Sequence, residues 1–284
     1  MNQQRKFDYR FSATMLDAYE DFLDANAEDF FYQDDAGRWH RNYNEETGEY
    51  HFTESEVYEL AKKELIDKIN RVEFTPSEAA SKGTALNEIV DSILEHRKAE
   101  GVTVTRMYEW LDGRQTDKVV GLQAAIDGFT FPFSTTLCLE VADYFQGSVC
   151  QMFTSAPLQT CYGLVELYGY ADYVREDKVF DLKTTKKYEF GKYEKKWQKH
   201  VYPYTLITSG KCTDVKAFEY TCYKLSGGNT RTPLIIGERN PEVYTFDYGM
   251  SKALLTEHCE SFAAFLMDNR ALIKDRKIFG GNEH

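Results

Sequence analysis

Asp172 and Asp181 lie in the segment 166–202, at a spacing that a β-hairpin would bring together. The pattern of this segment predicts a strand, a tight turn, a second strand and a lysine-rich helix. Four polar residues after Val174 separate two apolar runs, which is the pattern of a β-hairpin. A turn centred on them pairs Val174 with Val179. The same register places Asp172 directly opposite Asp181, with Cβ atoms roughly 4.5–5.5 Å apart on one face. The segment therefore predicts two carboxylates held close together.

Opposed carboxylates repel each other unless a cation lies between them. Carboxylate oxygens are ligands that suit Mg²⁺ or Mn²⁺, and the backbone carbonyl of Leu182 could supply another oxygen. Lys183 follows Asp181 by two residues, so it lies on the same face, about 6.6 Å along the strand. There it could orient a water molecule or stabilise negative charge in a transition state. The alternative is a surface salt-bridge ladder, because Asp-x-Lys alone occurs by chance in many proteins.

A helix expected over residues 75–100 could bring one more polar group to this place. Its apolar residues form a stripe centred near Leu86. Asn87 falls at the edge of the stripe, whereas Glu88 points almost the opposite way, towards water. Asn87 or Asp91 is therefore better placed than Glu88 to reach a site beside the core. The alternative is an edge asparagine that makes an ordinary hydrogen bond.

The remaining elements follow from periodicity, capping residues and turn signals. Further helices are expected at 12–32 with Ser12 as cap, 53–70 with a Thr53–Glu56 capping box, 134–145, 190–208 and 250–274. Strands are expected at 102–108, 117–126, 148–154, 160–174, 178–184, 214–224, 232–236 and 242–247, with a polar hairpin at 38–52. The segments 148–154, 160–174 and 178–184 form an antiparallel meander broken at Pro157. This mixture predicts an α/β (α+β) fold.

Composition limits the classes of protein to consider. The chain has 284 residues, 42% of them hydrophobic and 28% charged, which is ordinary for a globular protein with a sizeable core. The net charge of −12 argues against a protein that coats nucleic acid over its whole surface. It leaves room for a local basic groove.

Cysteine usage and the apolar runs point to a cytoplasmic protein. None of the six cysteines forms a C-x-x-C pair, so no iron–sulfur or cysteine-bound zinc site is expected. The N-terminal residues lack the apolar core of a signal peptide, and no run reaches the roughly 18 apolar residues of a membrane span. We therefore expect reduced thiols and no membrane partner.

Positive charge is concentrated beside the two aspartates. Residues 181–200 contain seven lysines against Asp181, Glu189 and Glu194, a local balance of +4. Aromatic residues interleave with these lysines, namely Tyr188, Phe190, Tyr193 and Trp197. Such a mixture is typical of a groove that follows a nucleic-acid strand and stacks its bases. A solvated helix face remains the alternative for Lys195, Lys196 and Lys199.

Three short motifs occur in a recognisable order: Gly-Tyr-Ala-Asp at 169–172, Asp-Leu-Lys-Thr-Thr at 181–185 and Gln-x-x-x-Tyr at 198–202. This order resembles the PD-(D/E)XK nuclease superfamily, in particular its RecB-type branch of phage or CRISPR-associated exonucleases. Two positions depart from the family pattern. Ala171 stands where proline is frequent, and Asn87 stands where a metal-binding histidine is common.

The resemblance implies one nuclease domain with a restriction-endonuclease-like core, a central mixed β-sheet flanked by helices. The core would span about 75–225, with additions at 1–74 and 226–284. By resemblance, Mg²⁺ or Mn²⁺ would be bound by Asp172, Asp181, the Leu182 carbonyl and Asn87, and Lys183 would help activate the attacking water. Residues expected to brace the site or contact DNA are Thr184, Thr185, Lys186, Lys187, Gln198 and Tyr202.

The function implied is that of a metal-dependent deoxyribonuclease, and more specifically an exonuclease of recombination, repair or phage replication. It would act on DNA in the cytoplasm of a bacterium or of a phage-infected host cell. Two alternatives stay open. One is a non-catalytic nucleic-acid-binding or assembly module on the same fold, which Asn87 favours. The other is a metal-dependent hydrolase of a different phosphate ester.

Overall fold

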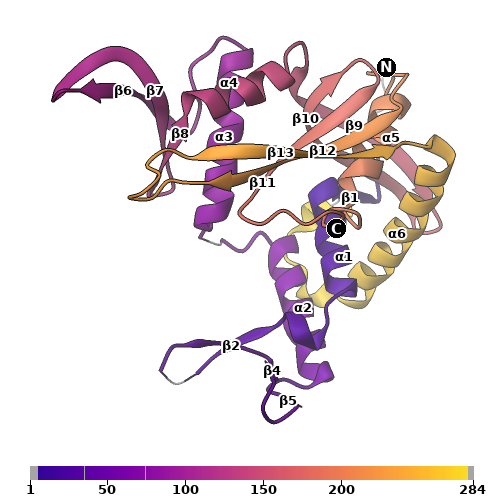
Figure 1. Ribbon diagram of the computed structural model, residues 1–284. Coiled ribbons are helices and arrows are strands. Elements are labelled where there is room, and N and C mark those ends of the chain that lie inside the picture. Colours follow the sequence, from indigo (N-terminus) through magenta and orange to yellow (C-terminus); the bar gives the residue numbers. More distant parts are fainter. Residues whose placement is uncertain (1–5, 35, 74, 281–284) are drawn as a thin grey trace.

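A six-stranded mixed sheet forms the centre of the protein (Figure 1). The structure is a computed structural model that describes residues 6–34, 36–73 and 75–280. The sheet consists of β1 (Tyr9–Ser12), β9 (Val149–Thr160), β10 (Gly163–Arg175), β11 (Lys178–Thr185), β12 (Ala217–Ser226) and β13 (Ile236–Thr245). The order is β1-β10-β11-β12-β13, and β9 also pairs with β10. The pairs β1–β10 and β11–β12 are parallel, and the other pairs are antiparallel.

Two different strands pair with separate parts of one edge of strand β10. Strand β9 follows β10 over most of its length and so occupies one edge. On the other edge, β1 pairs with residues 165–168, and β11 pairs with residues 173–175. Within the described chain, residues 169–172 have no strand partner on that second edge. The sheet is therefore open at the point where the predicted Gly-x-x-Asp motif lies.

The predicted hairpin register is confirmed for Val174 opposite Val179 and Tyr173 opposite Phe180, but the predicted pairing of Asp172 with Asp181 is not formed. The ladder ends at Tyr173 and Phe180. One residue further on, Asp172 Oδ2 accepts a hydrogen bond of 2.9 Å from the Leu182 N–H. Strand β11 then continues in parallel with β12. The two strands thus separate just where the carboxylates begin.

Two hydrophobic clusters hold helices against the sheet. One cluster joins the sheet to the four helices α1 (Ala13–Leu23), α2 (Glu54–Ile69), α5 (Gln198–Thr208) and α6 (Tyr248–Asp268). The other joins it to α3 (Glu78–Leu94) and α4 (Thr135–Tyr144). The expected mixed α/β architecture, a central mixed sheet flanked by helices, is confirmed. Among the described residues, no helix is both long and apolar enough to cross a membrane.

Two additions extend away from the sheet (Figure 1). A three-stranded sheet of β6 (Thr103–Leu111), β7 (Arg114–Ile126) and β8 (Phe129–Ser134) projects as a long hairpin beside α4. Near α2 lie the short strands β2 (Phe31–Gln33), β3 (Trp39–Arg41), β4 (Tyr43–Asn44) and β5 (Glu49–Tyr50). Short 3₁₀ turns occur at Ala27–Asp29, Arg270–Leu272 and Arg276–Phe279.

Capping residues were the most reliable local signals. Ser12 and Ser134 cap α1 and α4, and Thr53 forms the predicted capping box with Glu56. Residues 112 and 113 form the turn between β6 and β7, and both have positive φ. Helix α3, however, begins after Ser77 rather than Thr75, and it ends at Leu94 instead of near residue 100.

Several boundaries were wrong where long-range packing decides them. The helix expected at 12–32 ends at Leu23, and the helix expected at 190–208 begins only at Gln198. Pro157 lies inside β9 rather than between strands, which an edge strand permits. The two strands expected at 232–236 and 242–247 are the single strand β13. Strands β1 and β8 were not predicted.

Candidate active site

A polar cleft of about 440 Å³ opens at the unpaired stretch of β10. The first turn of α1, the middle of α3, the start of α5 and the strands β10 and β11 all contribute to its wall. Seven of the residues predicted from sequence line it: Asn87, Asp172, Asp181, Leu182, Lys183, Gln198 and Tyr202. The sequence motifs, spread over more than a hundred residues of chain, therefore meet around one space.

The carboxylate of Asp181 is the most deeply buried charged group of the cleft. The residue is only 2% exposed, and its Oδ2 lies 2.6 Å from Lys183 Nζ. Within the described chain this Oδ2 has no hydrogen-bond donor in regular geometry, so the contact is an ion pair. Lys183 keeps part of its side chain exposed. The pair is therefore closed towards the core and open towards the cleft.

Burial and electrostatic interactions shift the pKa values of Asp172, Asp181 and Lys183. Burial and the nearby charge of Asp181 raise the pKa of Asp172 to about 7. Burial also raises the pKa of Asp181, although Lys183 and Gln198 oppose the change. Burial lowers the pKa of Lys183, but the two carboxylates outweigh it, and its pKa rises. A cation bound between the aspartates would add a positive charge to that of Lys183, and it would lower the pKa of both carboxyl groups.

Helix α5 contributes Gln198 and Tyr202, one turn apart on one face. The Gln198 side-chain amide donates to the Tyr202 hydroxyl at 3.4 Å and opposes the rise in the pKa of Asp181. The tyrosine ring packs on Gly169, where an added Cβ would meet Tyr202 Cε1 at 2.7 Å. The glycine of the Gly-x-x-Asp motif thus makes room for this tyrosine beside the cleft.

Asn87 reaches the cleft from α3, as the position of its apolar stripe predicted. Its Oδ1 accepts a hydrogen bond of 2.7 Å from the Tyr173 hydroxyl. One turn earlier, Gly83 lets α3 approach β11, since a Cβ there would lie 3.0 Å from Thr184 Oγ1. The amide group is therefore held in place by a buried tyrosine.

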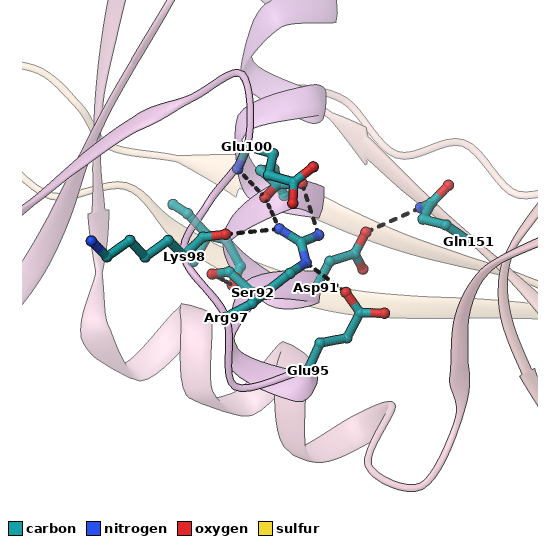
Figure 2. Close-up of polar contacts among 9 residues, drawn as sticks. Asp91, Ser92, Glu95, Arg97, Lys98, Glu100 and Gln151 are labelled. Carbon is teal, nitrogen blue, oxygen red and sulfur yellow. Dashed lines mark hydrogen bonds and ion pairs between the residues drawn. The ribbon is translucent and has the colours of Figure 1, made fainter.

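One turn after Asn87, α3 carries a second polar residue, Asp91, whose contacts Figure 2 shows. Asp91 is almost fully buried, and its Oδ2 accepts a bond of 3.2 Å from the Gln151 amide. Burial raises the pKa of Asp91 to about 6. Gln151 adopts a φ of 47°, which is unusual for a residue other than glycine, and it lines the cleft. Strain of this kind is common where side chains are positioned for function.

The C-terminal end of α3 is fixed by Arg97, which binds Glu95 and the carbonyl of Lys98 (Figure 2). The same guanidinium pairs with Glu88, whose carboxylate also accepts the Glu100 N–H at 2.6 Å. Glu88 was predicted to face water, and that prediction was wrong. Its side chain is mostly covered because the chain after α3 folds back over it.

Three predicted residues line a separate depression of about 290 Å³ beside the cleft, namely Thr184, Thr185 and Lys186. Thr185 is engaged in a local turn, where it donates to the Lys187 carbonyl at 2.7 Å. Lys187 forms an ion pair with Glu189. These four residues lie after the carboxylates on the chain but not in the same space.

The basic, aromatic groove predicted from residues 181–200 is not formed as expected. Residues before Gln198 are turns rather than helix, so the lysines do not share one helical face. Lys195 and Lys196 form ion pairs with Asp24 and Asp21. Three of the four interleaved aromatic side chains, Tyr188, Tyr193 and Trp197, pack against the core. The acidic α1 neutralises much of this local charge.

The donor set of the cleft fits a hard divalent cation. Two neighbouring carboxylates, the side-chain amides of Asn87, Gln151 and Gln198, and Leu182 line the same space. Among the described residues, no group of three or more His, Cys, Asp or Glu side chains is arranged to bind a metal. A cation here would therefore rely on the two aspartates, with neutral oxygens completing its coordination.

Some residues of the cleft were missed by sequence reasoning. Gln151 had no motif to mark it, because its role depends on an unusual backbone conformation. Thr14 and Tyr168 also line the cleft, and they arrive there because β1 pairs with β10. Alternation along 166–172 could have indicated that Tyr168 and Tyr170 share a face.

Comparison with known proteins adds little to this geometry. No family model matches the chain, and no curated protein matches it. The crystal structure of SSO0001 matches with 11% sequence identity and a TM-score of 0.24, over 43% of this chain and 55% of that chain. A likeness at that TM-score carries no argument, so the case for a function rests on the cleft itself.

Proposed function

We propose that the protein is a Mg²⁺- or Mn²⁺-dependent nuclease that hydrolyses phosphodiester bonds of DNA. The observation that carries the proposal is the pair of closely placed, desolvated carboxylates with Lys183 beside them at an open cleft. The mixed sheet and the order of the three motifs support a restriction-endonuclease-like core. Exonuclease action in recombination, repair or phage replication is the form that the motifs favour.

In this proposal Asp172 and Asp181 bind the metal, and the Leu182 carbonyl and Asn87 add neutral oxygen ligands. A bound Mg²⁺ or Mn²⁺ supplies Lewis-acid activation of a water molecule and of a phosphoryl oxygen. Deprotonated carboxylates are needed for this role. The raised pKa of Asp172, about 7, means that binding a cation displaces a proton near neutral pH.

Lys183 acts on the substrate side of the site. Its ammonium group is paired with Asp181 and remains partly exposed. With that carboxylate held by a metal, Nζ would be free to hold the attacking water or to stabilise negative charge on the phosphoryl oxygens. Gln198 and Tyr202, joined to each other by a hydrogen bond of 3.4 Å, line the cleft together with Asp181 and would brace this side of the site.

The chain provides a matched control for the test. Asp214 and Lys216 have the same Asp-x-Lys spacing and form an ion pair of 3.0 Å, but both are exposed. We expect Asp181→Ala and Lys183→Ala each to lower metal-dependent cleavage of linear DNA by about 100-fold or more. Asp214→Ala and Lys216→Ala should leave cleavage unchanged. Robust cleavage by both cleft variants would contradict the mechanism.

A non-catalytic nucleic-acid-binding module is the second candidate. Asn87 favours it, because a neutral amide replaces an imidazole and leaves the carboxylate pair with fewer strong ligands. This candidate predicts metal-independent DNA binding and no cleavage of linear, nicked or single-stranded DNA with either metal. Turnover of small phosphodiesters without polynucleotide binding would instead indicate a different phosphate-ester hydrolase.

A further inference from the structure

Three aromatic side chains form a strip on the sheet beside the cleft: Tyr168, which is partly buried, and the exposed Tyr170 and Phe153. Tyr168 and Tyr170 alternate along β10, so they lie on one face. Phe153 of β9 is opposite Tyr170, and their ring centroids are 5.1 Å apart. Tyr170 is 57% exposed and Phe153 is 39% exposed. Large aromatic groups gathered in this way are not explained by the core.

The strip leads directly to the carboxylates. Both Tyr168 and Tyr170 line the cleft together with Asp172. Alternate residues of a strand are about 6.6 Å apart, so the rings begin one such step from the carboxylate. A substrate held at Asp172 would therefore extend over these rings.

Cationic groups stand at both ends of the strip. The Arg10 guanidinium lies 5.2 Å from the centre of the Tyr168 ring, where it also pairs with Glu166. At the other end, Lys211 Nζ lies 5.7 Å from the Phe153 ring and donates to the Phe153 carbonyl at 2.6 Å. Aromatic faces with nearby cations are the elements of a surface that binds single-stranded nucleic acid.

We infer that this aromatic strip binds the unpaired bases of a single-stranded polynucleotide whose backbone enters the cleft. Bases of a duplex already stack on one another, so the rings can only stack on bases that are unpaired. Stacking tolerates any base, because every base has a π-face. The inference rests on the proposed nuclease function, since it specifies the single-stranded end as the substrate of that site.

Binding can be measured with the full chain in EDTA, so that no cleavage occurs. The probe is a short oligodeoxynucleotide carrying 2-aminopurine, whose fluorescence reports stacking, beside an abasic oligomer of the same length. We expect Tyr170→Ala to weaken binding of the base-bearing oligomer by about tenfold and to abolish the stacking signal. Binding of the abasic oligomer should stay within twofold of wild type, because its phosphates are unchanged.

Three further variants sharpen the test. Tyr170→Phe should retain the affinity, because the ring rather than the hydroxyl makes the contact. Phe153→Ala should show a smaller loss than Tyr170→Ala and provides a second variant if the first does not fold. Trp39→Ala removes a 70% exposed aromatic residue on β3 and should change nothing.

The outcomes separate this inference from the proposed nuclease. Suppose that wild type cleaves DNA, but that Tyr170→Ala and Phe153→Ala both bind the oligomer as tightly as wild type. The inferred role of the strip is then overturned, whereas the proposed nuclease function is supported. Equal weakening of a blunt duplex and of a single strand also overturns it. If wild type stacks the probe on Tyr170 but never cleaves DNA with Mg²⁺ or Mn²⁺, the base-binding role of the strip is supported and the proposed nuclease function is contradicted. Failure to bind the base-bearing oligomer in EDTA overturns the strip, and the nuclease is then decided by the cleavage assay with Mg²⁺ or Mn²⁺.

Discussion

Asp172 owes its chemistry to where the hairpin ladder ends. If pairing continued beyond Tyr173 and Phe180, the two carboxylates would meet face to face on a closed sheet. Instead the strands separate, and Asp172 Oδ2 takes the Leu182 N–H while the cleft remains accessible. One hydrogen bond from the backbone therefore holds the first carboxylate, whereas an ion pair holds the second.

Replacing Asp172 with asparagine tests the electrostatic description of the site. Because burial raises its pKa to about 7, the folded protein binds more protons than the unfolded chain between about pH 4 and 7. The contribution of Asp172 to stability therefore falls as pH rises through that range. We expect Asp172→Asn, measured by urea unfolding in EDTA, to be more stable than wild type by about 1–3 kcal/mol at pH 8.

The difference should shrink at pH 5, where wild-type Asp172 is largely protonated. Asparagine keeps the side-chain oxygen that accepts the Leu182 N–H, so the substitution preserves this hydrogen bond. An Asp172→Asn protein that is less stable than wild type at pH 8 in the absence of metal would contradict the account of a strained carboxylate pair.

At the scale of elements, two helices are placed by contacts that are distant in sequence. Helix α5 lacks a capping side chain of its own. The cap comes from Asp17 of α1, whose Oδ1 accepts a hydrogen bond of 2.5 Å from the Trp197 N–H. This contact fixes the start of α5 and so brings Gln198 to the cleft. Helix α3 approaches β11 at Gly83 and presents Asn87 one turn later. The geometry of the site thus depends on how these helices dock on the sheet.

Gly169 is the position where this docking is most sensitive. A Cβ at this buried residue would meet the Tyr202 ring at 2.7 Å, so the helix or the ring must move. We expect Gly169→Ala to lower the free energy of unfolding by about 1–3 kcal/mol and to impair cleavage through displacement of Tyr202. Urea unfolding and DNA cleavage assays check both effects.

Gly249→Ala is the control, since a Cβ there makes only an ordinary contact of 3.5 Å with Asp247. Gly249 lies in the first turn of α6, where alanine is well accommodated. Unfolding of Gly169→Ala at the wild-type urea concentration would show that Tyr202 does not pack as described.

Local patterns in the sequence predicted much at this scale. The hairpin register, three helix caps and the cleft position of Asn87 follow from near neighbours in the chain. The start of α5 was wrong because its cap comes from another helix. Glu88 was misplaced because Arg97, after the helix, turns back to bind it.

The molecule as a whole creates the site by interrupting one strand edge. Strands β1 and β11 both pair with β10, and the gap between them is the cleft. Such an arrangement joins residues 9–12 to residues 165–168, which no local pattern reveals. The same long-range packing neutralises lysines that look like a basic groove in the sequence, because α1 places aspartates against them.

The most direct test of the proposed function is a structure of the protein soaked with Mn²⁺, whose anomalous signal locates the cation. We predict a single strong site, or two adjacent sites, in the cleft with Asp172 and Asp181 as ligands. The Lys183 ammonium, which lies 2.6 Å from Asp181 Oδ2 in the present structure, should then have moved away from that oxygen. A soaked crystal with no cation between these two aspartates, at a concentration that supports cleavage, would contradict the account.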